Sequence, residues 1–325
     1  MNAQWISRIA ILILSAAGFG LAAGEARAQG YPNKPITFVV PYGPGSGNDV
    51  IARILANKMS DSWGHPVVVV NRAGATGSVG LETTAKAAPD GYTIVIASTS
   101  QMINQHLSKV RYDMVRDFAP VSLSGTLSYS AAVLSSFPAK SLNELVAMAK
   151  ASPGKLNYTG TIGSIAHFMG EMLKTAHNVD LMMIPNKLIA DAEADVVSGR
   201  VEIWFAPLNN VLPYAKTGRM RVLGVTGEKR AAELPDVPTM AETGFPALDI
   251  SASYFILAPA GTPKPVIAAL NSEFAKAIGS KDVKDRLAAV GVDPSSGSPE
   301  EAGALLKSEV AKWGRIVKES GIRVD

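Results

Sequence analysis

The chain contains no cysteine in its 325 residues, which excludes disulfides, cysteine-ligated iron–sulfur clusters and thiol catalysis. Its net charge is also small, +3 from 31 basic and 28 acidic residues, and this balance argues against nucleic acid as a partner. Low-complexity tracts are missing, while hydrophobic residues make up 47% of the chain. The composition therefore indicates a globular protein that is long enough for two domains.

Motifs for nucleotide binding and for hydrolysis are missing too. The chain has no Gly-Lys-Ser/Thr of a P-loop and no G-x-S-x-G nucleophile elbow. Its four histidines do not stand four residues apart, and no carboxylate–histidine cluster has metal-ligand spacing. The sequence therefore predicts no cofactor and no metal site. A hydrolase with His167 as the base for Ser164 is one alternative, because catalysis by serine needs a base nearby.

The first 28 residues have the pattern of a secretory signal peptide. Residues 1–8 carry a positive charge and no acidic residue, and residues 9–23 are apolar or small. Ala26-Arg27-Ala28 then has the small-x-small form of a cleavage site. Because the apolar run is short for a membrane span of ~20 residues, we expect cleavage after Ala28 rather than a membrane anchor.

Strand-like apolar runs alternate with helical patterns along the rest of the chain. Ser141-x-x-Glu144 is a capping box, and Ser298 precedes Pro299 at the start of a helix that Gly321 ends. Continuous apolar strands between helices indicate an α/β fold with sheets covered on both faces. The strands are expected at 36–40, 67–70, 92–97, 118–123, 131–134, 181–184, 201–205, 221–225 and 253–258.

Two segments, 124–129 and 246–251, are candidate hinges between two α/β lobes. A chain that crosses twice between such lobes leaves a cleft, and ligands favour clefts of this kind. We therefore expect a ligand site where the lobes face each other.

Four polar turns between strands and helices are the candidates for that site. Each helix start favours a negative ligand by ~0.3–1 kcal/mol, and a hydrogen bond to a carboxylate contributes ~1.5–3 kcal/mol. Ordinary helix capping is the alternative explanation, since every helix needs a start. A nucleotide phosphate is a further alternative for the glycine-rich first turn, although its Gly-x-Gly-x-Gly spacing is not that of a dinucleotide fingerprint. The turns lie at 41–49, 71–78, 98–101 and 159–164.

A series of motifs, in order along the mature chain, resembles the substrate-binding proteins of tripartite tricarboxylate transporters, also called Bug-type (Bordetella uptake) receptors. The first is Tyr31-Pro32-x-Lys34-Pro35-Ile36, and the glycine-rich turn Pro41 to Asp49 matches the length of the family's P-[FY]-P-A-G-G-x-[TN]-D turn. Each motif is unspecific by itself, whereas their common order is specific. The others lie at 67–77, 87–93, 117–121, 153–158, 234–239 and 258–263.

The resemblance implies a two-lobed periplasmic binding protein of type II, with lobe 1 formed by residues 29–127 and 250–325 and lobe 2 by residues 128–249. Such a protein is a monomer in the periplasm that closes on a small carboxylate and delivers it to membrane permease subunits, without catalysis. A sensory receptor that signals to a membrane partner is the alternative, because it uses the same closure.

The resemblance also implies which residues bind the ligand, and several of them by way of ordered water. Asp49 would repel a carboxylate directly, so we expect it to orient waters at the first turn of its helix. The residues that the family's pocket implies are Ser46, Gly47, Asn48, Asp49, Ser98, Thr99, Ser100, Gly163, Ser164 and His167; Tyr42 and Thr161 from the same turns, and Asn186 and Ala206, complete the predicted site.

Departures from the family pattern concern the far end of the pocket. Pro185-Asn186-Lys187-Leu188 stands where Pro-Tyr-Lys-Gly is frequent, and Phe205-Ala206-Pro207 stands where Phe-Asp-Asn is frequent. The missing aspartate makes an amino-acid ligand less suitable. If Ile165, Leu188 and Ala206 line the cleft, they favour a carboxylate with an apolar or aromatic body.

Overall fold

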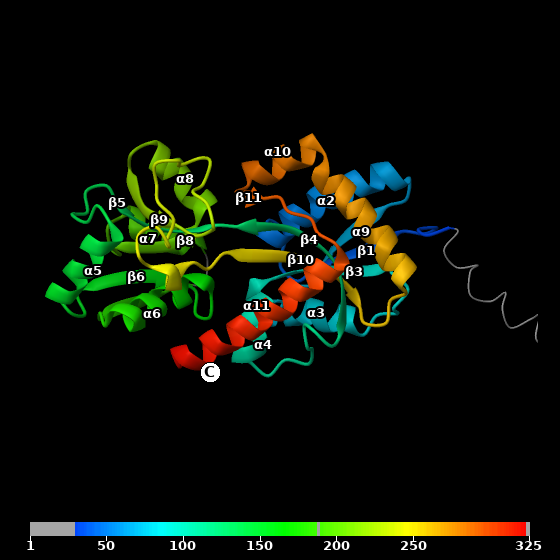
Figure 1. Cartoon of the computed structure of the whole chain (residues 1–325), viewed down its shortest axis with the longest axis horizontal. Helices are drawn as coiled ribbons and strands as arrows, with labels where there is room; N and C mark the ends of the chain where they lie inside the picture. Colours follow the sequence, from blue (N-terminus) through cyan, green and yellow to red (C-terminus); the bar gives the residue numbers. More distant parts are fainter. Residues whose placement is uncertain (1–29, 187–188, 323–325) are drawn as a thin grey trace, which may run out of the picture.

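The computed structural model describes residues 30–186 and 189–322 (Figure 1). The expected signal peptide at 1–28 and Leu188 of the expected apolar wall lie outside these residues. Over the described part of the chain, strands and helices alternate and form two separate sheets, which confirms the predicted α/β class. The order within the sheets shows how the polar turns are positioned.

The first sheet has six strands in the order β11-β4-β10-β3-β1-β2. Strands β1, β2 and β3 are parallel to one another, and β10 runs antiparallel between β3 and β4. Its strands are β1 (Ile36–Val40), β2 (Val67–Asn71), β3 (Thr93–Ser98), β4 (Phe118–Leu127), β10 (Ala252–Pro259) and β11 (Val292–Asp293). The helices and short turns that accompany it are α2 (Gly47–Trp63), η1 (Ala75–Gly77), α3 (Ser78–Ala85), α4 (Thr99–Leu107), α9 (Lys264–Gly279), α10 (Lys281–Ala289) and α11 (Pro299–Ser320).

The second sheet has five strands in the order β7-β6-β8-β5-β9. We propose the two sheets, each with its helices, as the cores of the two lobes expected from the sequence, and call them lobe 1 (six strands) and lobe 2 (five strands). The strands of lobe 2 are β5 (Tyr129–Leu134), β6 (Leu156–Gly160), β7 (Leu181–Pro185), β8 (Ile203–Pro207) and β9 (Met220–Val225). Its helices are α5 (Leu142–Ala151), α6 (Ile165–His177), α7 (Ile189–Val197), α8 (Leu208–Lys216) and η2 (Pro246–Leu248).

The chain passes between the two sheets at two neighbouring places. Only Ser128 separates β4 from β5, and the segment between β9 and β10 leads back. Thr226 joins the two crossings, because its hydroxyl accepts a hydrogen bond from the Tyr129 N–H at 2.8 Å and lies 2.9 Å from the Ser251 hydroxyl. In Figure 1 the sheets lie at opposite ends of the molecule with β4 and β10 running between them.

Burial explains why the strands were visible in the sequence. All residues of β8 and β10 are buried, as expected of strands that are covered on both faces. Two strands were not predicted. In β6, Asn157 and Thr159 interrupt the apolar pattern, and β11 is only two residues long, so neither carries a local signal.

Helix α11 joins the two lobes along one side of the molecule (Figure 1). The Val310 carbonyl lies 2.9 Å from Nε2 of His106 on α4 of lobe 1. Three residues further on, the ring of Trp313 packs edge-on against Phe168 on α6 of lobe 2, with ring centroids 5.4 Å apart. One stretch of α11 therefore contacts helices of both lobes. No helix in the described ranges combines the length and the apolar character that crossing a membrane requires.

Candidate ligand-binding site

The glycine-rich first turn ends in the N-terminus of α2. Gly45 has φ of +82°, a conformation that glycine adopts without strain. Ser46 is the N-cap, and its Oγ accepts a hydrogen bond from the Asp49 N–H at 3.3 Å. The N–H groups of Gly47 and Asn48 belong to the first helical turn, where no carbonyl of the helix can receive them. They form the positive end of the helix, although the Asn48 side chain itself is buried and donates to the Ile96 carbonyl at 3.3 Å.

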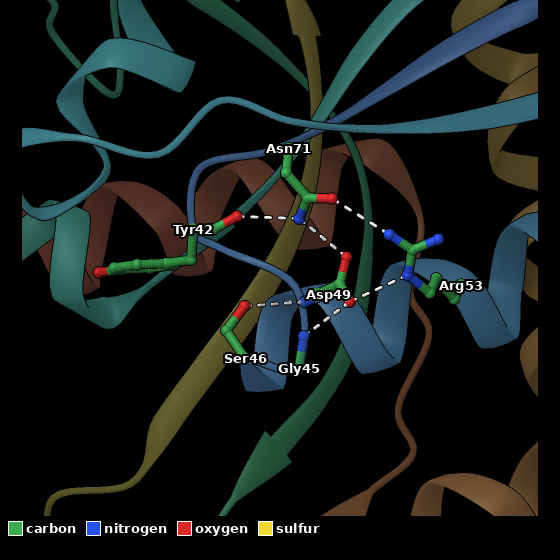
Figure 2. A network of polar contacts seen from close by, with 6 residues as sticks. All are labelled: Tyr42, Gly45, Ser46, Asp49, Arg53 and Asn71. Atoms are coloured by element: carbon green, nitrogen blue, oxygen red, sulfur yellow. Dashed lines mark hydrogen bonds and ion pairs between the residues drawn. The ribbon is translucent and has the colours of Figure 1, made fainter. Parts of the chain in front are cut away.

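Asp49 holds this turn together (Figure 2). Its carboxylate accepts hydrogen bonds from the Gly45 N–H at 3.0 Å, from Asn71 Nδ2 at 2.8 Å and from Arg53 Nε at 2.9 Å. Burial alone would raise the pKa of Asp49, but these hydrogen bonds outweigh it and the pKa is lowered. The side chain is only 3% exposed. Both carboxylate oxygens are therefore engaged in hydrogen bonds inside lobe 1.

Gln101 connects the first turn to the start of α4. Its Oε1 accepts from the Ser98 N–H at 2.7 Å, and its Nε2 donates to the Tyr42 hydroxyl at 2.8 Å. Thr99 is fully buried and its hydroxyl accepts from the Ser253 N–H at 2.9 Å, so its side chain fastens α4 to β10. Ser100 is half-buried beside Tyr42. Gln101 is not among the predicted site residues, although Ser98-x-x-Gln101 is a capping box visible in the sequence.

In lobe 2 the turn before α6 repeats this design. Gly163 has φ of +75°, Ser164 is the N-cap, and the Ser164 Oγ accepts from the His167 N–H at 3.4 Å. The Gly163 N–H donates to Nδ1 of His167 at 3.1 Å. Burial lowers the pKa of His167, which favours the neutral ring that this bond requires. Since Nδ1 is already occupied and no hydrogen bond joins the ring to the Ser164 hydroxyl, the two residues do not form a nucleophile and its base.

Stability should fall as the pH is lowered through the ordinary histidine value of 6.5, because His167 takes up its proton more readily in the unfolded chain than in the folded one. Protonation also ends the acceptor role of Nδ1 toward the Gly163 N–H. Thermal unfolding between pH 8 and pH 5 measures this loss. The decline should be smaller in His167→Asn, whereas His65→Asn, in the turn before β2, should behave as the wild type; equal slopes in all three proteins would contradict the assignment.

Of the other predicted residues of lobe 2, Asn186 is half-buried beside the turn 159–164, and its N–H donates to the Gly160 carbonyl at 3.0 Å, whereas Ala206 lies inside the lobe. Asn186 Nδ2 donates to Asp195 at 2.9 Å, and its Oδ1 is in contact with the Thr159 hydroxyl. Ala206 is fully buried in β8. Ile165 is 2% exposed and belongs to the hydrophobic core, so neither it nor Ala206 forms the apolar wall that the sequence led us to expect. Both face inward because of the register of their elements.

The predicted residues thus form two groups. The lobe 1 group surrounds the starts of α2 and α4 and is connected through Tyr42 and Gln101. The lobe 2 group consists of the turn before α6, where Thr161 is exposed. Among the described residues, no hydrogen bond joins the two groups. Starts of helices that follow parallel strands are where α/β proteins bind ligands, which places the lobe 1 group at the expected edge of its sheet.

A cavity of about 680 Å³ lies between the lobes, but on the other face of the crossing strands. Thr126 and Ser253 line it, and none of the predicted site residues does. The next residue, Tyr254, points instead toward Gly47, whose Cβ, if it had one, would lie 3.0 Å from the Tyr254 hydroxyl. Because successive strand residues face opposite sides, the cavity is separate from the polar turns. Within residues 30–186 and 189–322, no cluster of acidic and histidine side chains could hold a metal ion.

A family model described as the tripartite tricarboxylate transporter family receptor matches residues 51–322. The chain belongs to this family. It is 34% identical over 320 residues to the protein BugT of Bordetella pertussis. The aligned region covers 97% of this chain and 98% of the relative. The resemblance deduced from the motifs is therefore confirmed.

Solved structures of similar proteins agree with the observed fold. The periplasmic binding protein BugD is 30% identical with a TM-score of 0.76, over 90% of this chain and 99% of that one. Rpa4515 of R. palustris, solved with adipate, is 31% identical with a TM-score of 0.79, over 90% of this chain and 99% of that one. MatC from Rhodopseudomonas palustris, with bound malate, is 27% identical with a TM-score of 0.73, over 88% of this chain and 100% of that one. These neighbours are solute-binding receptors rather than enzymes, and the receptor described here shares their α/β periplasmic binding protein fold.

Proposed function

We propose that the receptor captures a small organic carboxylate between its two lobes and delivers it to the permease subunits of a tripartite tricarboxylate-type transporter. The observation that carries the proposal is the first turn, where the free N–H groups of Gly47 and Asn48 stand at the positive end of α2. Asp49 presents no open charge there, because internal donors occupy its carboxylate. An anion therefore meets donors and a favourable helix end.

Lobe 2 supplies the opposing contact in this proposal. The start of α6 offers the Ser164 hydroxyl and the first N–H groups of the helix. Ile162, in the same turn, is an apolar side chain that is 50% exposed. We propose that it contacts the hydrocarbon part of a ligand. It would then provide the apolar contact that the sequence led us to expect from Ile165 and Ala206. The relatives with adipate and malate support the dicarboxylate class.

The remaining parts of the proposal concern location and assembly. Relatives of this family are periplasmic binding proteins, and the N-terminal pattern is that of a signal peptide cleaved after Ala28. We propose that the exported protein is a periplasmic monomer. Native mass spectrometry of the purified protein measures its mass after export. The same spectrum reveals any ligand that copurifies.

Thermal shift with adipate, malate, benzoate and glucose tests the ligand class. A ligand at a hundredfold excess over Kd stabilises the folded state by ~2.7 kcal/mol, so at least one of the acids should raise Tm. Glucose should leave Tm unchanged. A shift with glucose and with none of the acids would refute the carboxylate proposal.

Ser164→Ala should weaken the binding of such an acid by ~1–3 kcal/mol, because it removes a hydroxyl from the ligand turn of lobe 2. The substitution also removes an N-cap, which alone costs ~1 kcal/mol of stability. Ser141→Ala is the matched control, since Ser141 caps α5 through the Glu144 N–H in the same way. Both variants should lose stability, and only Ser164→Ala should lose affinity in calorimetric titration. Equal affinity in the two would exclude Ser164 from the site.

A further inference from the structure

Tyr254 lies where the first ligand turn meets the crossing strands. It is 5% exposed on β10, and its hydroxyl lies 3.0 Å from the position that a Cβ on Gly47 would occupy. Within the described residues this hydroxyl forms no hydrogen bond. It is nevertheless not one of the completely enclosed polar atoms without a partner. The hydroxyl is therefore not completely enclosed, and it lies beside the N-terminus of α2 while the ring is buried.

Tyr129 brings a second hydroxyl to the same place. It is the first residue of β5, one position beyond the crossing, and its ring is partly buried against the core. Burial raises the pKa of Tyr129, with a further contribution from the nearby hydroxyls of Tyr254 and Tyr42. The pKa of Tyr254 is raised by burial and by Tyr42. On the neighbouring strand β4, Gly125 lies opposite Tyr254, and Tyr129 follows Gly125 four residues later along the chain.

The hydroxyl groups differ in what they already contact. Tyr42 accepts a hydrogen bond from Gln101 at 2.8 Å and lies 3.4 Å from the Thr76 carbonyl. Tyr129 and Tyr254 have no such partner among the described residues. A polar group on a buried side chain is destabilising when unpaired, so these two hydroxyls call for water or a ligand.

We propose that Tyr129 and Tyr254 are ligand-binding residues whose hydroxyls donate hydrogen bonds to a carboxylate held at the N-terminus of α2. The proposal rests on the proposed function and names further residues of its site. The available groups are two phenol hydroxyls, which can donate, and the N–H groups of Gly47 and Asn48, which can only donate, next to the positive end of a helix. A carboxylate oxygen accepts from each of them, whereas a cation would face two N–H groups that cannot accept and the positive end of the helix.

The two tyrosines belong to different lobes, so a ligand that contacts both also links the lobes. Tyr254 belongs to the sheet of lobe 1 and Tyr129 to the sheet of lobe 2, each beside a crossing. A carboxylate that receives both hydroxyls is bound by both lobes at once. It favours the arrangement in which the two hydroxyls converge, because a ligand shifts a conformational equilibrium by its differential affinity.

Calorimetric titration of adipate and malate into the full-length mature protein tests the assignment. Tyr254→Phe and Tyr129→Phe should each raise the Kd by about ten- to a hundredfold, the range for a hydrogen bond to a charged group. Tyr31→Phe is the matched control. It removes a hydrogen bond to the Gly91 carbonyl at 2.7 Å, remote from the ligand turns, and should lower Tm without changing the Kd.

Gly47→Ala tests the same place while both tyrosines are kept. The added methyl group would lie 3.0 Å from the Tyr254 hydroxyl, in the space assigned to the carboxylate. Alanine suits the first turn of a helix, so Tm without ligand should be kept while the Kd rises at least about tenfold. Gly279→Ala, at the end of α9 with open space around it, should leave both unchanged.

The outcomes separate this assignment from the proposed function. Wild-type binding together with unchanged Kd values in Tyr254→Phe, Tyr129→Phe and Gly47→Ala would overturn the tyrosine assignment and leave the receptor function intact. A wild-type protein that binds no carboxylate would overturn both.

Discussion

Trp313→Ala should lower the free energy of unfolding by ~3–5 kcal/mol, the range for removal of a large buried aromatic side chain. Trp313 is fully buried on α11 and packs edge-on against Phe168 of lobe 2. Its loss leaves a cavity at a place where α11 contacts both lobes. Urea denaturation followed by circular dichroism measures the change.

Trp313→Phe is the control for this prediction. It keeps an aromatic ring against Phe168 and removes the indole N–H, which is buried and has no hydrogen-bond partner in the part of the chain that the structure describes. We therefore expect a much smaller loss than for alanine. A loss below about 1 kcal/mol for Trp313→Ala would show that α11 does not depend on this contact.

Asp49→Ala should lower the free energy of unfolding by ~2–4 kcal/mol, because it removes a buried carboxylate that accepts hydrogen bonds from three donors. The Gly45 N–H and Asn71 lose a hydrogen bond, and Arg53 loses its ion pair. The first turn would lose its shape, so carboxylate binding should weaken as well. Urea denaturation and calorimetric titration measure the two effects.

The pH dependence of this contribution follows from the lowered pKa of Asp49. The stabilisation is complete above the ordinary aspartate value of 3.8 and is lost as the pH falls through the folded-state value. The difference in stability between the wild type and Asp49→Ala should therefore shrink in acid. Asp61→Ala, at an exposed position of the same helix, serves as the control and should remain within about 0.5 kcal/mol of the wild type. Equal stability of the two variants would contradict the role assigned to Asp49.

Features that depend on near neighbours in the chain could be predicted from the sequence. The N-cap at Ser298 is one, since its partner Glu301 lies three residues away. The caps at Ser46, Ser141 and Ser164 follow the same logic. The apolar strands could be predicted because burial on both faces demands a continuous run of apolar residues. These local signals determined the α/β class and the polar turns.

The roles of individual side chains depended on distant parts of the chain. Ile165 follows the cap of α6 and faces the core rather than the ligand turn. Tyr254 meets Gly47 across more than 200 residues, and no pattern in the sequence brings them together. Asp49 and Asn71 show the same dependence, because α2 must pack on β2 before their side chains can meet.

The sequence by itself determined the family, the alternation of strands and helices, and the glycine-rich turn that ends in α2, because each depends on residue types within a few positions. The tertiary structure decided which groups of that turn form hydrogen bonds within the protein. It engages the carboxylate of Asp49 in internal hydrogen bonds and brings the hydroxyl of Tyr254 from a crossing strand to Gly47. The reason is physical: hydrogen-bond partners and burial are set by contacts between elements that lie far apart along the chain.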